Sequence, residues 1–168
     1  MKLPNCKILE IGIGRGRFGI LLGKKFRYYY GIEPNKELLK IARKNKEENV
    51  IYKWGKAENI PFNKKFDIVF YALSWHFIKD FDKVLSEALR VIKRKGIIII
   101  LEPTEKTKYW KDSRLNKSSK NFDENVFNKK IIKLKKGQKI ILNQKIFTIL
   151  ENEYESKSGL RCYLLKND

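Results

Sequence analysis

The sequence predicts an α/β fold in which a doubly wound, mostly parallel sheet is followed by a C-terminal antiparallel hairpin. Short apolar runs alternate with amphipathic helical stretches between about residues 7 and 103. A glycine-rich turn separates the first apolar run from the first helical stretch. Near the C-terminus, two strand-like runs flank a polar turn. Strands that are apolar throughout and linked by helices indicate a parallel sheet covered on both faces.

Five strands and three helices are expected in the first 103 residues. The strands are the apolar or aromatic runs at residues 7–11, 28–33, 50–54, 66–71 and 97–101. The helices have apolar residues at helical spacing and cover residues 17–25, 36–46 and 80–93. Gly96 follows the basic last turn of the third helix and is expected to end it.

The first two helices are each expected to bury an apolar face against the sheet. In the first helix this face consists of Phe18, Leu21 and Leu22. In the second helix it consists of Leu38, Leu39, Ile41 and Ala42. Ligands of such sheets bind beyond the carboxyl ends of the strands, where the strand order reverses, and we expect the functional site there.

The pattern changes after residue 103, although the whole chain of 168 residues is expected to form one domain. Residues 123–136 are expected to be helical, and residues 145–153 and 160–165 to form an antiparallel hairpin. Residues 134–144 fit either a helix or a strand. The basic stretch 106–139 is a solvated face, a cover for the site or a docking surface.

The composition favours a globular protein with a strongly basic surface. Hydrophobic residues make up 42% of the chain, and 38 Lys and Arg against 19 Asp and Glu give a net charge of +19. This charge indicates either an RNA or other polyanionic partner, or a lysine-rich composition without such a partner. The longest apolar run, residues 96–101, is far shorter than the roughly 20 residues that span a bilayer. With no apolar signal segment at the N-terminus, we expect a cytoplasmic protein without membrane contact.

A structural metal site is not expected. Cys6 and Cys162 lie at opposite ends of the chain, and His76 is the only histidine. Zinc sites need four clustered ligands, mostly cysteine and histidine. The two cysteines are therefore expected to be reduced, buried thiols.

Gly12, Gly14 and Gly16 alternate between the first strand and the first helix. Such a turn gathers backbone N–H groups at the N-terminus of the helix, and negatively charged ligand groups are favoured there. Residues 14–19 also match the Gly-x-Gly-x-x-Gly dinucleotide motif, with Glu33 about 20 residues further on. Glu10 at the end of the first strand, followed by alternating glycines, favours a cofactor other than a dinucleotide.

With Glu10 and Glu33 in these places, the sequence resembles the class I S-adenosylmethionine-dependent methyltransferases. Within this family it resembles the small-molecule branch that includes ubiquinone and menaquinone biosynthesis enzymes. Four segments carry the resemblance: residues 8–18, 30–35, 54–62 and 66–73. The resemblance implies a Rossmann-like, seven-stranded fold and the cofactor S-adenosylmethionine, with S-adenosylhomocysteine as product.

The resemblance also assigns roles to individual residues. Glu10 would lie near the ammonium group of the cofactor, Arg17 near its carboxylate, and Glu33 would accept both ribose hydroxyls. Ala57 and Glu58 would frame the adenine. The complete set implied to bind the cofactor is Glu10, Gly12, Gly14, Gly16, Arg17, Glu33, Pro34, Ala57, Glu58 and Tyr71.

The acceptor is expected beside residues 71–78. His76 is a candidate general base because its ordinary pKa is near neutral, and a packed or capping histidine is the alternative. Tyr71 and Trp75 either shelter the sulfonium or belong to the core. A small metabolite is the favoured acceptor, and an RNA-directed methyltransferase or a non-catalytic binding protein are the alternatives. Because the first strand begins near residue 7, we expect an open site, or one covered by a second subunit or partner.

Overall fold

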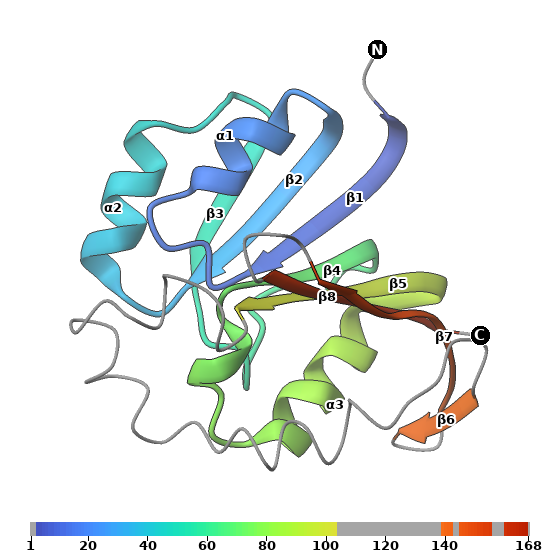
Figure 1. The fold of residues 1–168 in the computed structure, drawn as a ribbon. Coiled ribbons are helices and arrows are strands. Elements are labelled where there is room, and N and C mark those ends of the chain that lie inside the picture. Colours follow the sequence, from blue (N-terminus) through green and yellow to red (C-terminus); the bar gives the residue numbers. More distant parts are fainter. Residues whose placement is uncertain (1–2, 104–138, 143–144, 156–159, 168) are drawn as a thin grey trace.

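The computed structural model describes residues 3–103, 139–142, 145–155 and 160–167. In this part of the chain, eight strands form one sheet in the order β3-β2-β1-β4-β5-β8-β7-β6 (Figure 1). The strands are β1 (Leu3–Ile11), β2 (Phe26–Glu33), β3 (Val50–Trp54), β4 (Phe66–Ala72), β5 (Ile92–Pro103), β6 (Lys139–Leu142), β7 (Lys145–Glu155) and β8 (Leu160–Asn167).

The sheet is parallel in its first five strands and antiparallel in its last three. β1 pairs with both β2 and β4, and β2–β3 and β4–β5 are also parallel. β8 runs antiparallel to β5 and β7, which confirms the predicted hairpin. The resemblance implies seven strands, and the described residues form eight, because residues 139–142, left undecided between helix and strand, pair with β7 as β6. The predicted helix at residues 123–136 lies outside the described residues.

Helices cover both faces of the parallel half. α1 (Arg17–Gly23) and α2 (Lys36–Lys44) lie on one face, and the 3-10 helix η1 (Trp75–Phe77) and α3 (Phe81–Val91) lie on the other (Figure 1). No helix in the described ranges is long and apolar enough to span a membrane.

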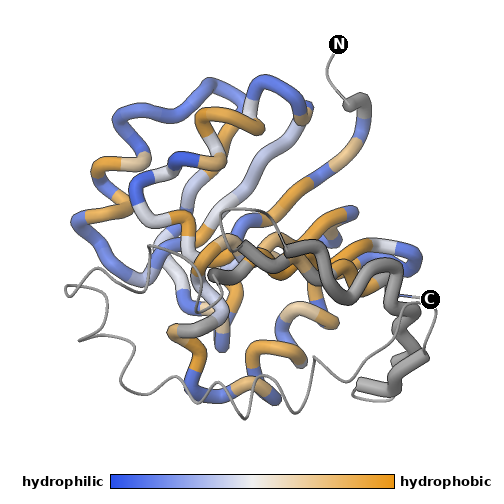
Figure 2. Tube along the Cα trace, viewed as in Figure 1, coloured by the Kyte–Doolittle hydropathy of each residue, from blue (hydrophilic) through white to orange (hydrophobic). Residues whose placement is uncertain are grey.

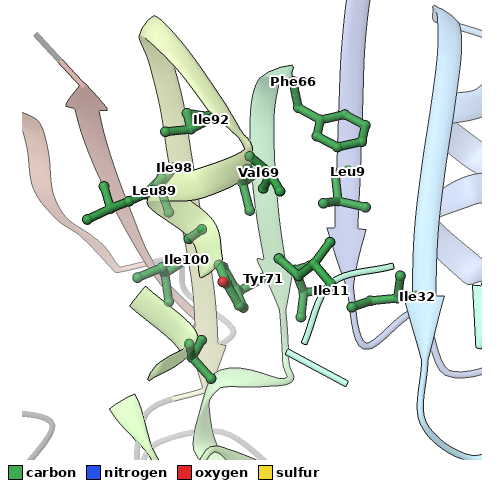
Figure 3. Close-up of a cluster of buried hydrophobic side chains, with 14 of the residues drawn as sticks. Leu9, Ile11, Ile32, Phe66, Val69, Tyr71, Leu89, Ile92, Ile98 and Ile100 are labelled. Atoms are coloured by element: carbon green, nitrogen blue, oxygen red, sulfur yellow. The ribbon is translucent and has the colours of Figure 1, made fainter. Parts of the chain in front are cut away.

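Two cores result from the alternation of side chains along the strands. On β1, Ile8 belongs to the cluster under α1 and α2, whereas Leu9 belongs to the cluster under α3. Figure 3 shows the α3-side cluster, in which side chains of β1, β2, β4 and β5 meet. Figure 2 shows that hydrophobic residues follow β4 and β5 through the middle of the molecule. The doubly wound prediction is therefore confirmed.

Side-chain caps explain where α2 and α3 begin. The Asn35 side chain accepts hydrogen bonds from the backbone of Glu37 (2.9 Å) and Leu38 (3.1 Å). Asp80 accepts one from the backbone of Lys83 (3.0 Å). These bonds satisfy N–H groups that have no partner within the helix.

Gly96 does not end α3, contrary to the prediction. The helix ends at Val91 and β5 begins at the next residue, so Gly96 lies within the strand. The register of β5 against β4 shifts between Ile92 and Ile97, and a Cβ at Gly96 would lie 2.7 Å from Cγ1 of Ile92. Glycine therefore fits a bulge in β5 where the chain folds closely upon itself.

Two residues predicted to face the core are exposed instead. Leu21 in α1 is 61% exposed and Ile41 in α2 is 37% exposed. In α1 the buried residues are Gly19 and Gly23, so this short helix approaches the sheet through its glycines. The predicted burial of both cysteines is also corrected, because Cys6 and Cys162 are half-buried free thiols.

The outer edge of the sheet at β3 is covered by a side chain of α2. Arg43 donates hydrogen bonds from Nε (3.3 Å) and Nη2 (3.0 Å) to the backbone carbonyl of Tyr52. Among the described residues, β3 has a strand neighbour, β2, on one side only. The guanidinium therefore provides polar partners on the other side of β3, where the described part of the chain adds no strand.

Gly19→Ala tests the close approach of α1 to the sheet. A Cβ at Gly19 would overlap the hydroxyl of Tyr52. Alanine has the higher helix propensity by about 1 kcal/mol, but this overlap should dominate and lower the free energy of unfolding by about 2 kcal/mol. Urea denaturation measures the change, with Leu21→Ala as the exposed control expected to stay within about 0.5 kcal/mol of wild type. A more stable Gly19→Ala variant would contradict the packing described.

Candidate functional site

A cleft of about 980 Å³ opens at the carboxyl ends of β1, β2 and β4, where ligand binding was predicted. Its lining comes from five segments of the chain. These are residues 10–15 with 17 and 18, residues 32–35 with 38, residues 55–58, residues 72–74 and residues 77–79. Segments far apart in the sequence therefore meet at one edge of the sheet.

The glycine turn begins at Gly12, a position where the backbone conformation and the close packing both require glycine. Gly12 has φ 76°, and a Cβ there would lie 2.7 Å from Cβ of Ser74. Its N–H donates to the carbonyl of Ile32 (2.9 Å). Ser74 in turn donates from Oγ to the carbonyl of Ile11 (2.7 Å), which holds the end of β4 against the turn. Ser74 lines the cleft and was not among the predicted site residues.

Gly14 differs from Gly12 because it faces the open cleft. Its φ is 55°, and a Cβ there would have no heavy atom within 4 Å. Its N–H donates to Oε2 of Glu33 (2.8 Å). The backbone at Gly14 is therefore open to the cleft, and no side chain separates it from a ligand there.

Glu33, at the end of β2, is held by two backbone hydrogen bonds. Oε2 accepts from Gly14, and Oε1 accepts from the N–H of Asn35 (2.9 Å). The residue is only 6% exposed and lines the cleft. Since each carboxylate oxygen has two lone pairs, the fixed carboxylate keeps acceptor capacity for two more donors. The neighbouring Pro34 also lines the cleft.

Glu10 is buried in the floor of the cleft. It is 1% exposed, and Oε2 accepts a hydrogen bond from the hydroxyl of Tyr29 (2.7 Å). Burial raises the pKa of the Glu10 carboxyl to about 7, although the Tyr29 bond and the positive charge of Arg17 partly oppose this rise. An acid in this state gains most from a ligand that brings a positive charge.

Gly16 and Arg17 are consecutive, but only Arg17 lines the cleft. Gly16 is buried before α1 and is absent from the cleft lining, and a Cβ there would lie 3.1 Å from Cβ of Ala42. The structure thus gives Gly16 a packing role against α2, and its contact with a ligand stays a prediction. Arg17 is exposed and lines the cleft, with its guanidinium 5.0 Å from the ring centroid of Phe18.

Tyr71 is likewise not in the cleft. It is fully buried in the α3-side core (Figure 3). Its ring meets that of Trp75 edge to face, with 4.7 Å between the ring centroids. Trp75 is 4% exposed, so both aromatic residues belong to the core. The prediction of Tyr71 as a cofactor contact failed because a strand apolar on both faces does not reveal which residues point toward the helix.

The segment after β3 brings Ala57 and Glu58 to the cleft, where both are half-buried, and their place at the adenine stays a prediction. The segment continues to Ile60, whose N–H donates to Glu87 of α3 (2.7 Å) and whose carbonyl accepts from Arg90 (2.8 Å). Glu87 and Arg90 also pair with each other at 2.7 Å. This ion pair positions the segment from α3, and the only sequence signal for it is the spacing of three residues.

The opposite wall of the cleft follows β4. Leu73 has φ 55° and its N–H donates to the carbonyl of Leu101 (2.8 Å). Phe77 lines the cleft and is 49% exposed, which the sequence analysis did not predict. The backbone of His76 lies in η1, whereas its side chain lies outside the described part of the chain, so its role as a base stays a prediction.

The fold and the cleft define a class of protein: an α/β domain with a cleft at a glycine turn, beyond the carboxyl ends of its parallel strands. The chain belongs to the methyltransferase-domain family, which matches residues 9–100. The resemblance to class I S-adenosylmethionine-dependent methyltransferases is thereby confirmed.

The chain matches related proteins over part of its own length and part of theirs. The uncharacterized protein MJ1123 of Methanocaldococcus jannaschii is 34% identical over 125 residues, which are 66% of this chain and 58% of that protein. The demethylmenaquinone methyltransferase of Thermotoga maritima is 33% identical over 99 residues, which are 57% of this chain and 43% of that enzyme. The chain spans about half the length of the curated relatives that it matches.

Solved structures share the fold over nearly the whole chain. An S-adenosylmethionine-dependent methyltransferase from Thermotoga maritima has a TM-score of 0.67 at 23% identity, covering 99% of this chain and 84% of that one. The YcgJ protein of Bacillus subtilis has a TM-score of 0.62 at 18% identity, covering 97% and 93%. At these identities the likeness concerns the fold.

Gly12→Ala and Gly14→Ala form a matched pair that tests the glycine turn. Both place a side chain at positive φ, which costs about 1–2 kcal/mol. Gly12→Ala also clashes with Ser74, so it should lower the free energy of unfolding by about 2 kcal/mol more than Gly14→Ala. Urea denaturation of both variants measures the difference. Equal losses would contradict the different surroundings of the two glycines.

Glu10→Gln tests the buried acid. Because the folded pKa is about 7 and the ordinary value is 4.5, the unfolded chain releases this proton first as pH rises. Stability should therefore fall by about 3 kcal/mol between those two pH values on account of Glu10. In Glu10→Gln this part of the pH dependence should be missing, as urea denaturation across the range would show. An unchanged pH dependence, matching that of the exposed control Glu48→Gln, would contradict the assignment.

Proposed function

We propose that this chain is an active S-adenosylmethionine-dependent methyltransferase with a small metabolite as acceptor. The observation that carries the proposal is the Glu33 carboxylate, which is held at the end of β2 with capacity for two further donors. A ribose offers two such donors in its hydroxyl groups. S-adenosylmethionine is the cofactor of the family to which the chain belongs.

The residues of the cleft fit this cofactor. The volume of about 980 Å³ is sufficient for a nucleoside joined to an amino acid. Gly14 leaves the backbone open at the turn, and the buried Glu10 would meet the ammonium group. Arg17 would meet the carboxylate, and Ala57 and Glu58 would lie at the adenine. A positive ligand group beside Glu10 would favour its ionised form.

When bound, this cofactor supplies a methyl group on a positively charged sulfur, which an acceptor displaces in line. The contribution of the protein is then mainly alignment and the exclusion of water. Leu73, Phe77 and Ile78 form an apolar wall of the cleft suited to that purpose. His76 in η1 is proposed as the base for acceptors that must lose a proton.

The small-metabolite acceptor is supported by relatives that are named as quinone-pathway methyltransferases. Besides the demethylmenaquinone enzyme, the ubiquinone/menaquinone biosynthesis C-methyltransferase of Rickettsia felis is 33% identical over 64% of this chain and 49% of that enzyme. The net charge of +19 favours a second candidate, an RNA-directed or non-catalytic binding protein of the same fold. A cytoplasmic location, and a second copy or partner that covers the open mouth, are part of the proposal.

Calorimetry with S-adenosylhomocysteine and NAD tests the cofactor assignment. We expect micromolar binding of S-adenosylhomocysteine and no binding of NAD, and the reverse result would overturn the proposal. Glu33→Ala should weaken S-adenosylhomocysteine binding about tenfold or more, because a charge-assisted contact is worth about 1.5–3 kcal/mol. The exposed Glu48→Ala is the control and should bind as wild type does.

Transfer of a labelled methyl group to metabolite and RNA pools tests the acceptor. Label in a small metabolite would support the proposal. Label in RNA alone would replace it with the second candidate. Cofactor binding without any transfer would leave a non-catalytic binding protein.

A further inference from the structure

A second hollow lies outside the cofactor cleft, between α2 and the end of β3. It has a volume of about 520 Å³ and is lined by Lys36, Leu39, Lys40, Arg43, Lys44 and Trp54. The four cations all come from α2, at positions that share one face of a helix. No acidic side chain of the described residues lines this groove, which we call the α2 groove.

Trp54 gives the α2 groove an aromatic surface. Its side chain is 50% exposed, although indoles are usually mostly buried. Nε1 donates a hydrogen bond to the carbonyl of Pro34 (2.9 Å), which holds the ring in one orientation. The ammonium of Lys36 lies 5.8 Å from the ring centroid. A fixed, half-exposed indole among cations is a stacking platform.

The cations have donors to offer. Arg43 uses Nε and Nη2 on the carbonyl of Tyr52, so its remaining guanidinium N–H groups can bind another acceptor. Lys40 and Lys44 are exposed and lie one helical turn apart. Phosphate groups are suitable partners for such donors, because they are anionic acceptors with several oxygens.

We propose that the α2 groove binds single-stranded nucleic acid, with backbone phosphates on Lys40, Arg43 and Lys44 and a base stacked on Trp54. Charge complementarity supports this occupant, since the chain carries a net charge of +19. An acidic peptide would use the cations but not the indole. A lipid surface would need several apolar side chains to insert, and Leu39, the other apolar residue of the groove, is 3% exposed.

The α2 groove adjoins the cofactor cleft through the turn between β2 and α2. Pro34 lines the cleft, and its carbonyl is the partner of Trp54. The α2 groove therefore lies beside the cleft, with this turn between them. The inference does not rest on the proposed function, because none of the side chains that line the groove lines the cleft.

Fluorescence anisotropy with a labelled oligouridylate of about 12 nucleotides tests the phosphate contacts. Lys40→Glu/Lys44→Glu should weaken binding about tenfold or more and reduce the slope of log K against log salt by about 1.4. The control Lys83→Glu/Arg94→Glu makes the same charge change at α3 and β5 and should weaken binding less than about threefold. Equal losses in the two variants, or no binding by wild type, would overturn the proposal.

Trp54→Ala tests the stacking contact. It should weaken oligouridylate binding about fivefold or more, whereas binding of inorganic polyphosphate should not change. Trp54→Phe should recover most of the loss. Equal effects of Trp54→Ala on both ligands, or wild-type binding to polyglutamate as tight as to oligouridylate, would overturn the proposal.

Calorimetry with S-adenosylhomocysteine separates this inference from the proposed function. The lysine double variant should bind S-adenosylhomocysteine as wild type does, which also shows that it folds. Cofactor binding without oligouridylate binding would overturn the groove alone. Oligouridylate binding without cofactor binding would overturn the proposed function and support the groove.

Discussion

The Glu33 carboxylate is the interaction on which the arrangement of the cleft depends. Its two oxygens accept backbone hydrogen bonds from Gly14 in the turn after β1 and from Asn35 before α2. Asn35 then caps α2 with its own side chain. One buried charge therefore fixes the turn, the end of β2 and the start of a helix together. A ligand that reaches this carboxylate finds it already oriented, so little ordering of the protein remains to be done on binding.

Glu10 and Glu33 lie on adjacent strands but have different surroundings. Glu33 is supported by two N–H donors, whereas among the described residues the Glu10 side chain accepts a hydrogen bond only from the hydroxyl of Tyr29. Desolvation therefore disfavours the charge on Glu10, as its raised pKa reflects. A buried acid that lowers the stability of the free protein at neutral pH is understandable when a cationic ligand group offsets the cost. At neutral pH, the protein with such a ligand bound beside Glu10 should therefore be more stable than the free protein.

Periodicity and turn chemistry predicted the five parallel strands, the three helices and the terminal hairpin, because long apolar runs and glycine turns leave few alternatives. They could not predict which face a residue takes on a strand that is apolar throughout, and Tyr71 was misplaced for that reason. Leu21 was misplaced because α1 packs through its glycines. The support of the segment after β3 by Glu87 and Arg90 depends on contacts 27 to 30 residues apart, which no local pattern contains. The predicted cofactor residues came from the family resemblance. Ser74 and Phe77 were recognised as cleft residues only in the folded structure.

The hydrogen bonds from Arg43 to Tyr52 have a consequence for how copies of the chain behave toward one another. An uncovered outer strand is a template on which a second molecule can add its own strand, and repeated addition leads to fibres. Here the carbonyl at the middle of β3 is already engaged by a cation from α2. A molecule approaching in register would have to displace that cation and bring its own basic surface against this one. The protein thus resists self-association at a side of the sheet where backbone geometry alone would invite it.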